Sequence, residues 1–228
     1  MASDNVLDEL TLGEGKGFDV EGHLLAVVRS VSSLQRDERG AHAVTLARSY
    51  ATTVDNLWGA VTNGTRIPRW FMPITGELRL GARYQLEGNA GGVVTPCDRP
   101  SHFEITWEFG GDVSWVEVGL SDDAVGHARL TLTHISHVSD HWDTYGPGAV
   151  GVGWEMGLVG LALYVKRPNE PKLDEAEFAV SPDGKAFITG SGEAWGNAAV
   201  AGGTAPHEAH AAARRTTAFY TGESIDPA

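Results

Sequence analysis

Residues 146–167 read GPGAVGVGWEMGLVGLALYVKR, with Pro147 near the start and Pro168 directly after the end. Proline is favoured in the first turn of a helix and stops a helix that precedes it, so these positions predict one helix. Glu155 is its only acidic residue, and a helix this apolar must be buried on most of its circumference. Its glycines each lower helix stability by about 1 kcal/mol, which indicates that other segments pack close to its backbone.

A transmembrane helix is the alternative for this stretch. Its length approaches that needed to cross a bilayer, and Gly153 and Gly157 have the spacing found in membrane helix pairs. Glu155 near the middle and the lack of a second such stretch in the sequence argue against it. We therefore expect no membrane span and a long helix pressed against a curved sheet.

Composition narrows the class of protein. The chain has 228 residues, enough for one large domain or a domain with an appendage, and a formal net charge of −13. This charge argues against a nucleic-acid partner. Cys97 is the sole cysteine, so no disulfide can form within the chain. The first residues lack a secretory signal pattern, and the expected location is the cytoplasm.

Residues 76–135 show a repeated period of two. Strict alternation is typical of strands with one buried and one wet face, so the pattern predicts an antiparallel meander whose buried face meets the 146–167 helix. The expected strands cover 79–87, 93–97, 101–109, 114–120 and 128–135. The larger side chains and polar groups placed on the buried face are Leu80, Tyr84, Phe103, Ile105, Trp107, Phe109 and His134.

The segments before this meander predict a hairpin and short helices. The expected elements, in chain order, are a short helix near 4–12, strands over 24–35 and 41–50 joined by a turn at 37–40, a helix over 54–62 and a shorter helix over 67–71. Thr53 is a suitable N-cap for the 54–62 helix. Arg48 shares the buried face of its strand, and since a buried charge needs a partner, an Arg48–Glu155 pair is one possibility.

The composition changes after Pro168 to a segment rich in alanine, glycine and charge. Helices are expected over 184–200 and 207–220, with contacts to the rest of the protein through Phe187, Trp195, Phe219 and Tyr220. We therefore predict a main domain over 20–168 and a helical C-terminal extension over 169–228. The extension is expected to act as a cover and to supply no catalytic group.

Four stretches carry a resemblance to a known superfamily. They read RSYATTVDNLWGAVTNGTRIPRWFMPITGELRLGARYQLEGNAGG at 48–92, TWEFGG at 106–111, LTLTH at 130–134 and GPGAVGVGWEMGLVGLAL at 146–163. They resemble the START/Bet v 1-like superfamily (SRPBCC). The bacterial branch similar to the Hsp90 ATPase activator C-terminal domain, often grouped with polyketide cyclase-like proteins, is the closer resemblance. The similarity covers 41–167.

This resemblance implies an α+β helix-grip fold, in which a curved antiparallel sheet wraps a long C-terminal helix and leaves a ligand cavity. Members of the superfamily bind lipids and hormones, act as cyclases or regulate chaperones, so the fold alone does not decide the function. Three alternatives follow: binding of a small hydrophobic or aromatic molecule, a cyclase or dehydratase that uses an inward histidine or tyrosine, and a chaperone-associated regulator. A homodimer remains open.

Candidate site residues come from the buried faces and from the expected cavity mouth. Ligand pockets are mostly apolar with a few placed polar groups, although core packing is the alternative for each aromatic residue. The expected ligand-binding residues are Trp70, Phe71, Tyr84, Trp107, His134, Trp154 and Leu158. The catalytic candidates are His134, Tyr84 and Glu155. A lone inward histidine is more often a hydrogen-bonded core residue, and becomes an acid–base candidate if it faces a wet cavity.

No metal or other cofactor is expected. His134, His137 and His141 have a suggestive spacing, but strand residues three apart point to opposite faces, and the later members are expected in a loop. The glycine-rich residues 13–17 lack the spacing of a phosphate-binding loop. Cys97 lacks a neighbouring cation that would activate a thiol, so a structural role is expected.

Overall fold

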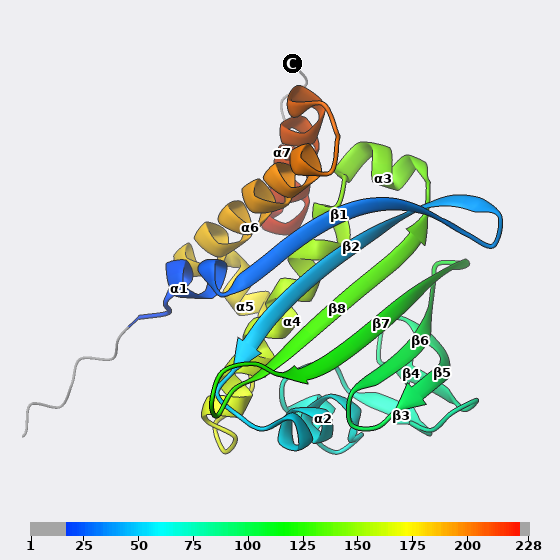
Figure 1. Ribbon diagram of the computed structural model, residues 1–228. Coiled ribbons are helices and arrows are strands. Elements are labelled where there is room, and N and C mark those ends of the chain that lie inside the picture. Colours follow the sequence, from blue (N-terminus) through cyan, green and yellow to red (C-terminus); the bar gives the residue numbers. More distant parts are fainter. Residues whose placement is uncertain (1–16, 224–228) are drawn as a thin grey trace, which may run out of the picture.

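An eight-stranded antiparallel sheet curves around the long helix α4 in the computed structural model, which describes residues 17–223 (Figure 1). The strand order is β1-β2-β8-β7-β6-β5-β4-β3, so β8 lies between the first hairpin and the meander. The strands are β1 Val27–Arg36, β2 Arg39–Tyr50, β3 Ile74–Gly76, β4 Arg83–Leu86, β5 Gly91–Asp98, β6 His102–Phe109, β7 Asp112–Asp122 and β8 Ala128–His137. The helices are α1 Val20–Leu25, α2 Val54–Thr62, the 3-10 helix η1 Ile67–Arg69, α3 Asp140–Tyr145, α4 Gly148–Lys166, α5 Glu175–Val180, α6 Pro182–Ala201 and α7 Pro206–Thr221. The predicted α+β helix-grip fold is confirmed.

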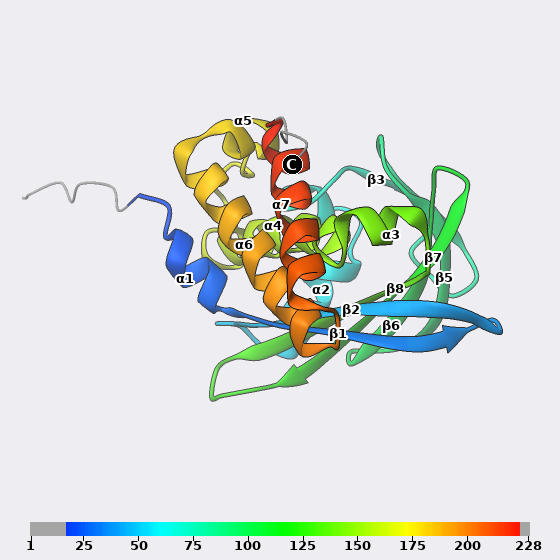
Figure 2. The same ribbon diagram turned by 90° about the horizontal axis from the view of Figure 1, so that it is seen from above.

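Helix α4 packs against the sheet and against the helices α6 and α7, and α6 also packs directly on β1 (Figure 2). Its glycines mark the closest approaches: a Cβ on Gly151 would lie 2.3 Å from the Trp195 ring, and one on Gly160 would lie 2.5 Å from the Trp70 carbonyl oxygen. Length and composition alone would let α4 cross a membrane. Here it is the core helix, and its Glu155 is fully buried within the protein.

The first hairpin begins later than predicted. Leu24 belongs to α1, because Asp19 caps this helix by accepting a hydrogen bond from the Gly22 backbone nitrogen at 2.9 Å. The turn is also tighter than the four residues expected. Asp37 and Glu38 alone form it, both with positive φ, as a two-residue hairpin loop requires. The helix expected near residues 4–12 lies outside the described residues.

The meander follows the predicted strands, although β5, β7 and β8 are longer than predicted and β4 is shorter. The strand predicted over 79–87 is reduced to β4, because Gly81 adopts a φ of +77° and turns the chain just before it. Leu80 is consequently exposed, and so is Phe109 at the last position of β6. Both were predicted to be buried. Alternation no longer predicts which side chains are buried where a strand meets a turn, because the pleat of the strand does not orient the side chains there.

The C-terminal segment forms the helices α5, α6 and α7, of which α5 was not expected. Trp195 and Ile188 of α6 are fully buried in the same apolar cluster as the inner face of the sheet. Tyr220 donates a hydrogen bond to the Ala149 carbonyl oxygen at 2.9 Å, whereas Phe219 is exposed. This segment therefore packs along α4, from Ala149 and Gly151 to Val159 and Leu163. The predicted division at residue 168 stays a prediction about independent folding.

Candidate ligand cavity

A cavity of about 390 Å³ lies between the inner face of the sheet, the α2–η1 segment and α4. Ligand pockets of small molecules have volumes of this order. Its wall is mostly aliphatic and aromatic. The aromatic part of the wall includes Trp58, Trp70, Phe71, Tyr84, Trp107 and Trp154. Leu158 of α4 also lines the cavity, so six of the seven predicted ligand-binding residues border one space, and His134 does not.

Four of these aromatic rings form a continuous wall. Phe71 stacks on Trp70 at 5.3 Å between ring centroids and faces Trp154 at 6.0 Å, with ring planes only 14° apart. Trp107 of β6 meets Trp154 at 5.0 Å, with its plane tilted by 60°. Gly157 makes room for the Phe71 ring, since a Cβ there would lie 3.2 Å from it. The result is a surface suited to a flat apolar molecule.

His134 is buried behind this wall and uses both ring nitrogens. Its Nδ1 accepts a hydrogen bond from the Trp154 indole at 2.9 Å, and because an indole only donates, this nitrogen carries no proton. Its Nε2–H then donates to the Ser114 hydroxyl at 2.9 Å, which donates in turn to the Trp107 carbonyl oxygen at 3.1 Å. Burial lowers the pKa of His134 to about 4. The imidazole is thus neutral near pH 7 and holds two tryptophans of the wall in place.

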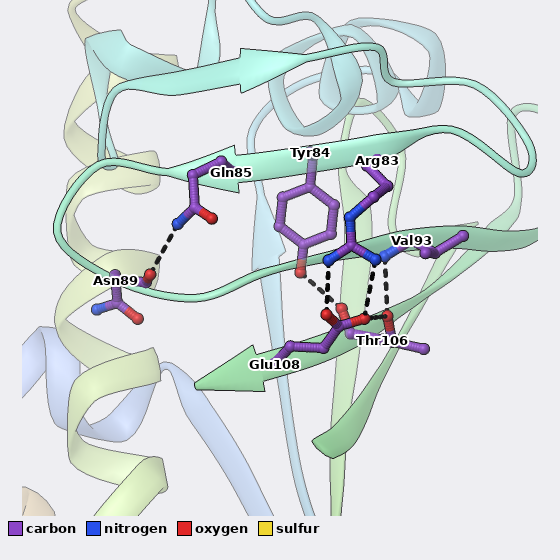
Figure 3. A network of polar contacts seen from close by, with 7 residues as sticks. All are labelled: Arg83, Tyr84, Gln85, Asn89, Val93, Thr106 and Glu108. Atoms are coloured by element: carbon purple, nitrogen blue, oxygen red, sulfur yellow. Dashed lines mark hydrogen bonds and ion pairs between the residues drawn. The ribbon is translucent and has the colours of Figure 1, made fainter. Parts of the chain in front are cut away.

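Tyr84 lines the cavity with its ring and binds the sheet with its hydroxyl (Figure 3). The phenol donates to the Thr106 carbonyl oxygen at 2.7 Å, and burial raises its pKa above the ordinary range. On the neighbouring positions, Arg83 forms an ion pair with Glu108 at 2.6 Å, and Glu108 accepts from the Thr106 hydroxyl at 3.1 Å. These contacts fasten β4 to β6.

Gly92 explains how Tyr84 reaches a strand that is not its neighbour. Gly92 is the β5 partner of Tyr84, and a Cβ on it would lie 2.0 Å from the Thr106 carbonyl oxygen. Only glycine leaves the phenol and this carbonyl free to meet across β5. The last glycine of the GNAGG sequence, Gly92, therefore serves the cavity wall.

Glu155 pairs with Arg29 and not with Arg48. Arg29 holds the carboxylate with two hydrogen bonds of 2.6 Å and also donates to the Leu24 and Val27 carbonyl oxygens. Arg48 contacts the His23 Nδ1 at 2.9 Å instead. The hairpin register places Arg29 opposite buried Leu46, on the same inward face as Arg48, which gives Glu155 a second candidate partner. Glu155 does not line the cavity.

Sequence reasoning missed several cavity residues, and two of them carry reactive or charged groups. Cys97, which was expected to be structural, and Arg99 both border the cavity, and both are exposed. Cys97 lies in the last part of β5, after the irregularity that begins at Val94, and Arg99 follows the strand in the turn into β6. No motif marks either residue. Their position next to a turn of the meander was the one available signal.

The spaced histidines of the β8–α3 region do not converge on one point. Residues 140–145 form α3, where a loop was expected, because Ser139 caps the helix by accepting from the Trp142 nitrogen at 3.3 Å. Within residues 17–223, no group of three histidine, cysteine or acidic side chains is arranged to hold a metal ion.

Comparison with known proteins shows what this chain is similar to. The family model described as Activator of Hsp90 ATPase homolog 1-like protein matches residues 51–166. The crystal structure of CalU16 from Micromonospora echinospora is 30% identical over 76% of this chain and 98% of that one, with a TM-score of 0.62. The solution structure of CalU16 is 29% identical over 78% of this chain and 97% of that one, with a TM-score of 0.64.

A more distant structure shares the fold alone. DynU16, titled a putative protein in the dynemicin biosynthetic locus, is 21% identical over 58% of this chain and 50% of that one, with a TM-score of 0.52. No curated protein matches this chain. The match of the family model over half of the chain confirms the resemblance seen in the sequence. This chain therefore belongs to the Activator of Hsp90 ATPase homolog 1-like family, within the SRPBCC superfamily.

Proposed function

We propose that this protein binds a small, flat, hydrophobic molecule in the cavity between its sheet and α4. The observation that supports this proposal is the cavity of about 390 Å³ with its continuous aromatic wall. Small-molecule sites are pockets of this order of volume, lined mostly by hydrophobic and aromatic side chains with a few polar groups. The lining of this cavity has that composition.

Binding is favoured over acid–base chemistry because the three catalytic candidates are already engaged. His134 uses both nitrogens within the protein, and the Tyr84 hydroxyl is bonded to a backbone oxygen. Glu155 is paired with Arg29 away from the cavity. A cyclase or dehydratase would need a proton donor or acceptor within hydrogen-bond reach of its substrate.

The direct test is the fluorescence of N-phenyl-1-naphthylamine, which rises when this neutral probe enters an apolar site. Leu158→Trp should fill the cavity from α4 and weaken probe binding at least about tenfold, since Leu158 lines it. Leu163→Trp is the matched control, because Leu163 lies on the same helix but packs in a different cluster. It should leave the affinity unchanged.

A second variant protects this test against misfolding. Val118→Phe fills the cavity from β7 with a smaller change, and alkylation of Cys97 at the cavity should slow when the probe is bound. If both filling variants fold and bind the probe like the wild type, the proposal is wrong. The chaperone-regulator alternative, which does not require the cavity, would then lead.

A further inference from the structure

The charge of the residues that line the cavity is opposite in sign to the net charge of the whole chain. The chain carries 30 acidic residues against 17 lysines and arginines. Among the described residues that line the cavity there is no aspartate and no glutamate, and Arg99 is the one with a permanent charge. A ligand that enters the cavity therefore meets one cation, Arg99, in a wall that is otherwise mostly apolar.

The other polar groups of the wall are largely occupied by the protein itself. The Thr62 hydroxyl donates to the Trp58 carbonyl oxygen at 2.7 Å, and the Trp70 indole donates to the Ala60 carbonyl oxygen at 3.0 Å. The Trp154 indole and the Tyr84 hydroxyl are bonded as described above. These groups hold the wall in shape and have little left to offer a ligand.

Arg99, in contrast, has no partner among the described residues. Neither the ion pairs nor the side-chain hydrogen bonds within residues 17–223 include it, although Asp98 is its neighbour in sequence. The indole nitrogens of Trp58 and Trp107 also make no hydrogen bond within residues 17–223. Neither nitrogen is among the fully buried polar atoms that lack a partner. The groups that remain for a ligand are thus N–H donors, with the Cys97 thiol as a weak addition.

Donors of this kind select ligands by their acceptor atoms. A guanidinium pairs best with a carboxylate, to which it can donate two parallel hydrogen bonds. We infer that the ligand is an amphipathic acid, with an aromatic body against the Trp70–Phe71–Trp154–Trp107 wall and a carboxylate or similar anionic group at Arg99. This inference rests on the proposed function, because it assigns the chemical class of the molecule bound in the same cavity.

Two fluorescent probes of nearly equal size test the inference: 1-pyrenebutyrate, which is an acid, and 1-pyrenebutanol, which is neutral. Wild-type protein should bind the acid more tightly, and Arg99→Gln should weaken the acid about three- to tenfold, as expected for a partly exposed ion pair. The same variant should change the affinity for the alcohol less than about twofold. Higher salt should reduce the preference for the acid in the wild type and have little effect in the variant.

Arg79→Gln is the matched control, since it removes the same charge from an exposed arginine that does not line the cavity. It should leave both affinities unchanged. Equal affinities of the wild type for the two probes, or an equal effect of Arg99→Gln on both, would overturn the inference. Failure of the alcohol to bind at all would instead count against the proposed function, so the two outcomes are distinguishable.

Discussion

At His134 and Tyr84, groups with catalytic chemistry serve as structural ties. His134 links Trp154 on α4 to Ser114 on β7, and Tyr84 links β4 to a backbone oxygen of β6. Each buried polar group left without a partner costs roughly 1–3 kcal/mol, so these bonds make the residues compatible with an apolar wall. Their chemistry is directed at the protein and not at the cavity.

The burial of His134 predicts a loss of stability in mild acid. Its pKa in the folded state is about 4, below the ordinary value of 6.5, so only the unfolded chain takes up a proton between these values. The contribution is fully present above pH 6.5 and is lost as the pH falls toward 4, by about 3 kcal/mol in total at roughly 1.4 kcal/mol per pH unit. Urea unfolding across this range should show the wild type losing its advantage over His134→Gln.

His127→Gln is the control for this pH series, because His127 is exposed. This variant keeps His134, so it should still lose stability as the pH falls from 6.5 toward 4. A constant difference between His134→Gln and the wild type across this range would show that the imidazole of His134 is not held neutral. The pKa of His23 is also lowered to about 4, mainly by burial, so the comparison between variants is needed to isolate His134.

Tyr84→Phe separates a structural tie from a catalytic group. Loss of the hydroxyl should destabilise the protein by about 1 kcal/mol, because the Thr106 carbonyl oxygen loses its donor. Affinity for N-phenyl-1-naphthylamine should stay the same, since the ring remains in the wall. A large loss of affinity without a loss of stability would return Tyr84 to the candidates for ligand contact through its hydroxyl.

At the scale of elements, the glycines of α4 let this long helix both line the cavity and pack closely against its neighbours. It must be long enough to carry Trp154 and Leu158 to the cavity, and it must let η1 and α6 approach its backbone. Gly160 lies against the backbone carbonyl oxygen of Trp70. This residue caps the 3-10 helix η1, so a Cβ at position 160 would have to displace backbone and not only a side chain. Gly153 lies against the Tyr220 hydroxyl, and a shift of this side-chain end would strain its bond to the Ala149 carbonyl oxygen without moving a backbone segment.

This difference predicts opposite outcomes for two identical substitutions. Gly160→Ala should destabilise the protein by about 1–3 kcal/mol through overpacking and should weaken probe binding, because η1 must move. Gly153→Ala should be close to neutral or slightly stabilising, since alanine favours helix by about 1 kcal/mol. Thermal unfolding and probe titration of both variants would measure this, and equal effects would refute the assigned close approach.

At the scale of the whole molecule, α4 contacts the C-terminal helices and also lines the cavity. The C-terminal helices pack along α4, where Trp195 meets Gly151 and Phe187 joins the cluster of Val159. The cavity is lined by other residues of α4, namely Trp154, Gly157 and Leu158, and none of its lining residues comes from the described part of the C-terminal segment. Stability and binding are therefore expected to be separable.

Trp195→Ala tests this separation. Removal of a fully buried indole should destabilise the protein by about 3–5 kcal/mol. The affinity of the folded protein for N-phenyl-1-naphthylamine should change less than about twofold, measured at a temperature well below unfolding. A parallel loss of affinity would show that the C-terminal helices shape the cavity through α4.

Much of this arrangement follows from local patterns in the sequence. Alternation in the 101–109 run placed Phe103, Ile105 and Trp107 against the core, and all three line the cavity. The position of Thr53 was enough to predict α2, because a cap acts within one turn of the helix. Patterns failed at the ends of elements, as at Leu80 and Phe109, where a turn overrides the pleat.

The sequence by itself determined the buried helix, the strands and the aromatic wall, since periodicity and composition act over a few residues. Tertiary structure alone decided which partners the inward polar groups find. Arg29 and Arg48 share one face, and only the packing of α4 against the rest of the protein assigns Glu155 to Arg29. The place of Arg99 at the cavity was decided in the same way, because the spacing between curved sheet and helix depends on every close contact along α4.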